Sequence, residues 1–243
     1  MAITILETPP LVAQTMRATI LFVDLRGYTG LAEQLSPAQV VSLLVEFYGV
    51  LMRATELHGG HIYHMAGDGM MAGFGMDRAS ENGAREALAA GLAILKHFAP
   101  IANRWHSELS IKTGIGIGMH LGDVALGAFG PPGRQATTLV GDTVNVAARL
   151  CSRARGGEVL FTDKVAAALD AHGAAKRPDR GSIPFLKLAQ YELRGRRKPL
   201  DIWCVPAPKR LQIVAKPALS PIRRQNAGAV SRAADRSPAR QQD

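Results

Sequence analysis

Residues 61–74 have the sequence His-Ile-Tyr-His-Met-Ala-Gly-Asp-Gly-Met-Met-Ala-Gly-Phe. Two short runs rich in apolar residues flank the turn Gly67-Asp68-Gly69, and Asp-Gly is a dipeptide typical of tight hairpin turns. The stretch therefore predicts a β-hairpin with a carboxylate at its turn. Taken alone, the dipeptide indicates a turn more strongly than it indicates a metal site.

The segments before this hairpin predict one strand and one long helix. Residues 17–24, Arg-Ala-Thr-Ile-Leu-Phe-Val-Asp, form a β-branched apolar run and predict a buried strand that ends in an acid. Ser36 and Pro37 are typical of an N-cap and a first helical position. Apolar residues then recur at helical spacing as far as Leu57, and a Gly pair follows.

The rest of the chain continues this alternation of helices and strands. We expect a helix at 79–102, two paired strands within 109–129, a turn or the tip of a projecting arm at 130–133, helices at 142–153 and 163–171, a short strand at 158–161, a polar loop at 172–184, and final strands at 187–193 and 200–205. The order predicts an α+β fold: a ferredoxin-like βαββαβ core sheet with helices packed on it, plus a β-arm and C-terminal additions.

The composition is that of an ordinary globular protein, with 47% hydrophobic and 20% charged residues. No apolar run reaches the ~20 residues that a membrane span needs, and the first ten residues lack the features of a signal peptide. The sequence therefore predicts a cytoplasmic location and no transmembrane segment. Cys151 and Cys204 stand in no metal-ligand spacing, and we expect both to be reduced packing residues.

The positive charge is concentrated at the end of the chain. Eight Lys or Arg and two Asp follow residue 208, a net +6 of the total +9. We expect an N-terminal extension at 1–14, one domain at 15–207 and a basic, disordered tail at 208–243. The tail predicts a solvated extension, with weak contact to a membrane surface, nucleic acid or a partner as the alternative. Without interleaved aromatic residues, it does not indicate a specific nucleic-acid partner.

Asp24 and Asp68 are candidates for a shared cation site. In a βαββ unit the hairpin can bring its turn alongside the end of the first strand, so both carboxylates can face one point. Two nearby acids repel one another unless a cation lies between them. Mg²⁺ suits this arrangement because it binds one or two carboxylates and completes its shell with water and phosphate oxygens. The alternative is a solvated strand end and an ordinary turn.

Three ordered blocks of sequence are similar to the class III adenylyl and guanylyl cyclase family. The resemblance extends from about Arg17 to Val205, most of the chain, and implies conversion of ATP into cyclic AMP and pyrophosphate. The blocks are Phe22-Val-Asp24-Leu-Arg-Gly27-Tyr-Thr29, Gly67-Asp68-Gly-Met-Met-Ala-Gly-Phe74-Gly75 and Leu139-Val-Gly141-Asp142-Thr-Val-Asn145-Val-Ala-Ala-Arg149-Leu.

The resemblance also implies a role for each matching residue. Two divalent metal ions, Mg²⁺ or Mn²⁺, would be held by Asp24 and Asp68, with help from the backbone carbonyl of Leu25. The remaining assignments are backbone amides of Gly27, Tyr28 and Thr29 for the phosphates, Asn145 and Arg149 for the ribose and the transferring phosphate, Arg196 for a phosphate, and His64 with Thr138 for the base.

The base-reading positions depart from the common family pattern. His64 stands where adenylyl cyclases usually carry Lys and guanylyl cyclases carry Glu, whereas Thr138 fits a subset of adenylyl cyclases. ATP is the favoured substrate, and GTP or relaxed selectivity is the alternative. Gly116 stands where relatives carry a phosphate-contacting arginine, for which Lys112 is a candidate substitute. These departures also leave open a catalytically weak, cyclase-like regulatory module that binds nucleotide or a partner.

The family resemblance implies a partner of a specific kind. In this family the metal-binding acids come from one subunit, and the base-reading residues with the Asn and Arg come from the other. Since one chain here contains both halves, a head-to-tail homodimer with two equivalent shared sites is implied.

Overall fold

Strand β1 (Gln14–Arg26) lies inside the sheet, hydrogen-bonded to an antiparallel neighbour on each side. The computed structural model describes residues 14–76, 83–131, 134–171, 185–188, 190–192 and 199–207. The neighbours of β1 are β3 (Gly69–Phe74) and β4 (Gly114–Phe129), and β2 (His61–Ala66) completes the hairpin with β3. The resulting order β2-β3-β1-β4 is that of a ferredoxin-like core, which confirms the predicted fold class.

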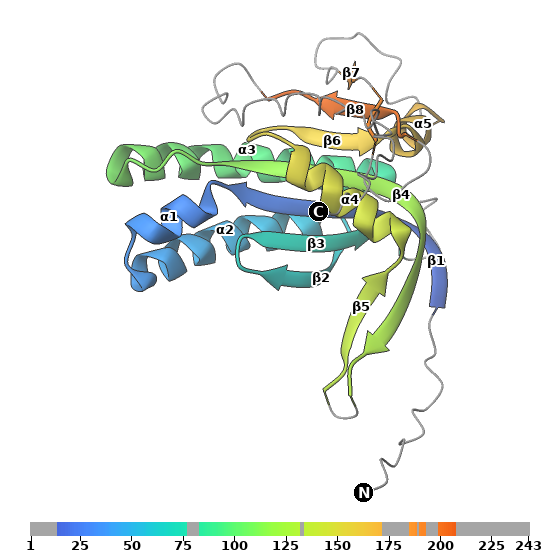
Figure 1. Cartoon of the computed structure of the whole chain (residues 1–243), viewed down its shortest axis with the longest axis horizontal. Helices are drawn as coiled ribbons and strands as arrows, with labels where there is room; N and C mark the ends of the chain where they lie inside the picture. Colours follow the sequence, from blue (N-terminus) through green and yellow to red (C-terminus); the bar gives the residue numbers. More distant parts are fainter. Residues whose placement is uncertain are drawn as a thin grey trace, which may run out of the picture.

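Among the described residues, four further strands extend this core. Strand β6 (Val159–Thr162) pairs parallel with β4, and β8 (Ile202–Val205) and β7 (Leu186–Lys187) follow it at the edge of the sheet. Strand β5 (Ala136–Val140) instead pairs with the far half of β4, and the two form an arm that projects from the body of the molecule (Figure 1). The predicted β-arm and C-terminal additions are therefore both present.

In the part of the chain that the structure describes, five helices connect these strands. They are α1 (Tyr28–Gln34), α2 (Pro37–Leu57), α3 (Ala84–Leu109), α4 (Asp142–Arg153) and α5 (Asp163–Ala171). The start of α2 is fixed as the sequence predicts: the Ser36 hydroxyl accepts from the backbone N–H of Gln39, while the Gln39 side chain accepts from the backbone N–H of Ser36. This capping box satisfies two amides that the first helical turn leaves without partners.

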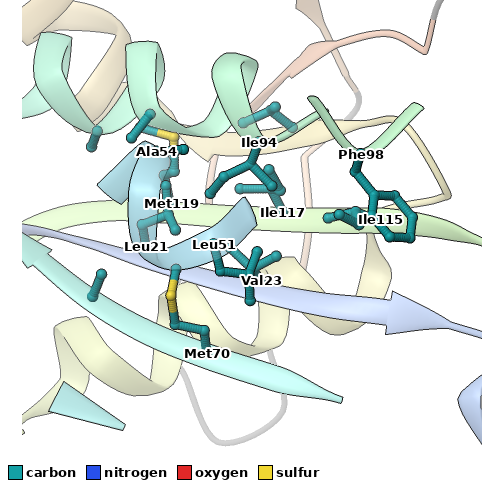
Figure 2. Close-up of a cluster of buried hydrophobic side chains, with 14 of the residues drawn as sticks. Leu21, Val23, Leu51, Ala54, Met70, Ile94, Phe98, Ile115, Ile117 and Met119 are labelled. Atoms are coloured by element: carbon teal, nitrogen blue, oxygen red, sulfur yellow. The ribbon is translucent and has the colours of Figure 1, made fainter. Parts of the chain in front are cut away.

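The two faces of β1 are covered by different helices. Alternate residues Leu21, Val23 and Leu25 point into the main core beneath α2 and α3. Figure 2 shows Leu21 and Val23 in this core together with Leu51 of α2 and Ile94 of α3. The intervening residues point to the other face, where Ile20 packs in a cluster with α4. Asp24 is an even-numbered residue of this strand and therefore lies on the α4 face.

The prediction of two paired strands within residues 109–129 was wrong. One strand, β4, runs without a turn from Gly114 to Phe129. Its glycines allow close approach rather than a reversal of the chain: a Cβ on Gly118 would lie 2.1 Å from the backbone nitrogen of Cys151, and one on Gly122 would lie 2.5 Å from the Thr143 hydroxyl. Both contacts are with α4, so these glycines let the helix lie directly on the sheet.

Other segments differ from the predictions or lie outside the described residues. The helix expected at 79–102 is α3, which ends later, at Leu109, and neither α1 nor β5 was predicted. The strand expected at 187–193 is shorter, with β7 at Leu186–Lys187 and an isolated bridge between Tyr191 and Leu200. Both cysteines are free and buried, as expected. Within the described part of the chain, no helix combines the length and apolar character that crossing a membrane requires. Residues 1–13, 172–184 and 208–243 are not among the described residues.

Candidate active site

The hairpin turn lies beside the end of β1, as its sequence predicts. The backbone N–H of Leu25 donates a hydrogen bond of 2.9 Å to the carbonyl of Asp68, and Asp24 stands opposite Gly69 in the β1–β3 register. Gly67 completes the turn with a positive φ of 56°, a conformation that favours glycine. The structure thus brings Asp24, Leu25 and Asp68 together where β1 ends beside the hairpin turn. We call this end of the central strands the carboxylate edge.

Asp24 has a charged neighbour that the sequence reasoning missed. Its Oδ2 lies 2.8 Å from Nη1 of Arg26, the next residue on the same face of β1, and a third of the Asp24 side chain is exposed. The spacing i, i+2 in a strand was the signal available in the sequence, because alternate strand residues share a face.

A second residue that the sequence analysis missed, Tyr48, is hydrogen-bonded to the hairpin turn. The hydroxyl of Tyr48, on α2, donates a 2.7 Å hydrogen bond to the carbonyl of Gly67. Burial first, and then the charges of Tyr28 and Asp68, raise the pKa of the Tyr48 hydroxyl above its ordinary value. The protonated donor is therefore retained throughout the neutral range. No local pattern in the sequence indicates this contact, because it joins residues 19 positions apart on different elements.

We expect Tyr48→Phe to lower the free energy of unfolding by about 1 kcal/mol at pH 7, the usual net contribution of one hydrogen bond. The native pKa is raised, so this contribution is complete below the unfolded tyrosine pKa of about 10 and is lost as pH rises through the native pKa. Urea unfolding of both proteins at several pH values measures the difference. Ser42→Ala, which removes an exposed hydroxyl from the same helix, is the control. Equal stabilities of the wild type and the variant at pH 7 would contradict the assignment.

The residues after β1 form a tight entry into helix α1. Gly27 is the N-cap with φ 78° and ψ 14°, in the left-handed region, and its carbonyl accepts from the N–H of Leu31. Tyr28 and Thr29 open the helix, and the first amides of any helix have no carbonyl partner within it. The three residues predicted to bind phosphate are therefore contiguous with the carboxylate edge.

Asn145 and Arg149 lie elsewhere. Both are exposed on α4, whose opposite side packs against the sheet through Thr143, Val146, Ala147, Leu150 and Cys151. Asp24 lies on the sheet face beneath that helix, whereas Asn145 and Arg149 are on the helix side that faces away from the sheet. Within one chain, the side chains of Asn145 and Arg149 therefore do not point toward the carboxylate of Asp24.

The predicted base-reading residues lie on β2 and β5, two strands that are not paired with one another. His64 is exposed on β2, opposite Met71 and next to an irregularity in the register, and Thr138 is half-buried on β5, opposite Gly127. Leu139, next to Thr138, packs over Gly73 of β3. The structure thus places β5 close to the hairpin that carries His64.

Two basic residues, Arg196 and Lys112, are the candidates for contact with a substrate phosphate. Arg196 lies outside the described residues. Lys112 is exposed and lines, with Gly27, Gly30 and Gln34 among others, a surface cavity of about 270 Å³ beside α1. Its carbonyl lies 3.6 Å from the position of a Cβ on Gly27. Lys112 therefore stays a candidate for phosphate contact.

The donors at the carboxylate edge fit a hard divalent cation. Two carboxylates and the Leu25 carbonyl are oxygen ligands, the type that Mg²⁺ and Mn²⁺ prefer. No group of three or more His, Cys, Asp or Glu suited to a metal ion occurs among the residues that the structure describes. Such a site would therefore draw its remaining ligands from water and substrate phosphates, as Mg²⁺ sites commonly do.

Comparison with sequence families gives one match across most of the chain. The family model described as adenylate and guanylate cyclase catalytic domain matches residues 12–205. An adenylate cyclase of Anabaena cylindrica is 34% identical over 163 residues, covering 63% of this chain and 31% of that protein. Adenylate cyclase 1 of Rhizobium meliloti is 29% identical over 195 residues, covering 79% of this chain and 28% of that protein. The chain thus spans less than a third of these relatives.

Solved structures give similar matches over nearly whole chains. The adenylyl cyclase CyaB from P. aeruginosa superimposes with a TM-score of 0.71 at 25% identity, covering 84% of this chain and 99% of that one. The guanylyl cyclase Cya2 superimposes with a TM-score of 0.68 at 26% identity, covering 85% and 97%.

Proposed function

Since this chain belongs to the adenylate and guanylate cyclase catalytic domain family, we propose that it converts ATP into 3′,5′-cyclic AMP and pyrophosphate for cyclic-nucleotide signalling. The reaction takes place at two equivalent sites, each shared between two copies of the chain. The observation that carries the proposal is the 2.9 Å bond from Leu25 N–H to the Asp68 carbonyl, which holds the hairpin turn beside Asp24.

The carboxylates of Asp24 and Asp68, with the carbonyl of Leu25, hold the metal ions in this proposal. The chemistry that two divalent ions, Mg²⁺ or Mn²⁺, supply when bound there is acidification of the ribose 3′-hydroxyl and neutralisation of charge on the phosphates. The oxygen donor set supports this assignment, because these cations bind carboxylates, carbonyls and phosphates together.

The other chain groups act on the nucleotide. Backbone amides of Gly27, Tyr28 and Thr29 donate to the phosphates, because the first turn of a helix presents unpaired N–H groups. Arg149 stabilises charge on the transferring phosphate through its planar fork of donors, and Asn145 orients the ribose. Arg196 is proposed as a further phosphate contact from the sequence alone.

The dimer is proposed because one chain separates the two halves of the site. Asn145 and Arg149 lie on the outward side of α4, away from the sheet face that carries Asp24. A head-to-tail pair brings the α4 residues of one copy to the carboxylate edge of the other, and the same operation forms the second site.

A guanylate cyclase, or a cyclase of relaxed selectivity, is the second candidate. The His64 imidazole is neither the Lys nor the Glu that family members usually carry at this position, so it favours neither base strongly. Incubating the purified protein with Mn²⁺ and either ATP or GTP, and identifying the cyclic product by chromatography, tests both candidates. Formation of neither cyclic nucleotide would overturn the proposed function.

We expect His64→Lys to raise the ratio of kcat/KM for ATP over GTP roughly tenfold, equivalent to one base-specific hydrogen bond of about 1.4 kcal/mol. His64→Glu should shift the ratio the opposite way. His97→Lys introduces the same charge at an exposed position of α3 and is the control. If both His64 variants keep the wild-type ratio, His64 does not read the base.

A further inference from the structure

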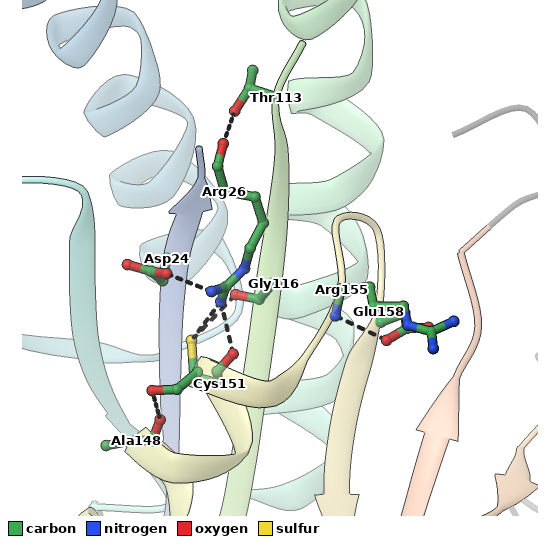
Figure 3. Close-up of polar contacts among 9 residues, drawn as sticks. Asp24, Arg26, Thr113, Gly116, Ala148, Cys151, Arg155 and Glu158 are labelled. Atoms are coloured by element: carbon green, nitrogen blue, oxygen red, sulfur yellow. Dashed lines mark hydrogen bonds and ion pairs between the residues drawn. The ribbon is translucent and has the colours of Figure 1, made fainter. Parts of the chain in front are cut away.

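The guanidinium of Arg26 lies between the carboxylate of Asp24 and the last turn of α4 (Figure 3). Nη1 lies 2.8 Å from Asp24 Oδ2, and Nη2 donates a 2.7 Å hydrogen bond to the carbonyl of Cys151. Only 10% of the Arg26 side chain is exposed. The hydroxyl of Thr113 donates to the carbonyl of Arg26 at 2.7 Å, so the backbone of Arg26 is also held.

Gly116, on β4, provides the space for this guanidinium. A Cβ on Gly116 would lie 2.4 Å from both Nε and Nη2 of Arg26 and 2.7 Å from Cζ. Real Cβ contacts are not this short, so any larger residue would displace the arginine head group. Gly116 lies inside strand β4, and its φ is not positive. It is therefore the Arg26 side chain, not the local backbone, that requires glycine here.

The ion pair also orients the Asp24 carboxylate. Arg26 contacts Oδ2, while Oδ1 lies 3.9 Å from the position of a Cβ on Gly69, the residue that follows Asp68. One oxygen is thus held by the guanidinium, and the other is directed toward the hairpin turn. Removing Arg26 would therefore remove this constraint on rotation about the Cα–Cβ and Cβ–Cγ bonds of Asp24.

Burying this guanidinium is a costly arrangement. Nε of Arg26 is buried and has no hydrogen-bond partner among the residues that the structure describes. A buried charged side chain is usually paired with an opposite charge. Even then the pair often contributes little to the free energy of unfolding, because the cost of removing both charges from water offsets their attraction. Stability alone therefore gives a weak reason for Arg26 at this position, and the orientation of Asp24 gives a stronger one.

We propose that Arg26 is a positioning residue for the metal-binding carboxylate of Asp24, with Gly116 as the gap that admits its guanidinium. The inference rests on the proposed function, because it assumes that Asp24 binds a cation. Arg26 acts through Asp24 and not on the nucleotide. Removing a residue that orients a metal-binding side chain commonly lowers metal affinity or activity about 10–100-fold.

The test is Mn²⁺ binding by the folded protein, measured from the electron paramagnetic resonance signal of free Mn²⁺ without nucleotide. We expect Arg26→Met to raise the Kd on the order of tenfold, and Arg26→Lys to give a smaller rise, because Lys keeps the charge but lacks the fork. The Mn²⁺ concentration for half-maximal turnover should rise in parallel. Unchanged or tighter Mn²⁺ binding in Arg26→Met would overturn the proposal, because the guanidinium would then be a competitor or a bystander.

Gly116→Ala provides a second route that leaves Arg26 itself intact. The added methyl group displaces the guanidinium, so we expect a similar weakening of Mn²⁺ binding. In the Arg26→Met background, Gly116→Ala should add less than a twofold further change, because the two substitutions disturb the same contact. Full additivity of the two effects would refute the role assigned to Gly116.

Two controls separate this inference from the proposed function. Arg17→Met removes an exposed arginine from the same strand and should leave the Mn²⁺ affinity unchanged. Asp24→Ala should lose binding altogether. If Asp24→Ala still binds Mn²⁺ like the wild type, the metal site itself fails. If Asp24→Ala loses binding and Arg26→Met does not, only the role of Arg26 fails.

Discussion

Asp24→Ala and Asp68→Ala are each expected to reduce Mg²⁺- or Mn²⁺-dependent cyclisation of ATP by a thousandfold or more. Each substitution removes one of the two carboxylates at the edge where the hairpin meets β1. The metal-bound charge that they position contributes several kcal/mol to the transition state, and about 4 kcal/mol corresponds to roughly a thousandfold in rate. Turnover at saturating ATP and metal measures the loss.

The fold should survive Asp68→Ala unchanged. Asp24→Ala also removes the ion-pair partner of the buried Arg26 guanidinium, so we expect it to lower the free energy of unfolding without abolishing the fold. Asp24 and Asp68 are partly exposed, and neither belongs to a buried apolar cluster. Circular dichroism and thermal unfolding check this point. Asp170→Ala, which removes an exposed acid from α5, is the matched control and should keep full turnover. Activity retained by both site variants would exclude the two carboxylates as metal ligands.

Mixing inactive Asp24→Ala chains with inactive Asn145→Ala chains is expected to restore about a quarter of wild-type turnover. With free exchange, half of the dimers are mixed, and each mixed dimer keeps one intact site of two. The intact site combines the carboxylates of one chain with the α4 residues of the other. The recovery should appear after co-expression or joint refolding, which allow the subunits to exchange.

The matched control combines Asp24→Ala with Asp68→Ala. Both substitutions damage the same half of the site, so every possible pairing leaves at least one carboxylate missing, and no activity should return. Affinity tags of two kinds on the two chains establish that mixed dimers form. Mixed dimers without recovery in the Asp24 and Asn145 pair would show that each chain builds its site alone.

Much of the fold was predictable because its determinants are local. The Gly-Asp-Gly turn predicted the hairpin at residues 61–74, and Ser36 with Pro37 predicted where α2 begins; the structure confirms both. The helices expected at 142–153 and 163–171 are present with the same bounds. In each case, residues within a few positions of one another decide the structure through turn chemistry, capping or apolar spacing.

The error at residues 109–129 shows where local reasoning ends. Glycines in a strand-like stretch resemble turn signals, but Gly116, Gly118 and Gly122 lie in one continuous strand. Their role depends on Arg26, on Cys151 and on Thr143, which contact them from other elements. Sequence spacing holds no information about these contacts, because packing between elements creates them.

The sequence by itself determined the hairpin with the carboxylate at its turn, the start of α2 and the acid near the end of the central strand. Only the tertiary structure decided which groups surround those acids. The Arg26 guanidinium fills the space above Gly116 and directs Asp24 toward the turn of Asp68, while Tyr48 holds that turn from α2. These contacts join residues distant in the chain, so they arise only when the packed helices and the sheet fix their distances.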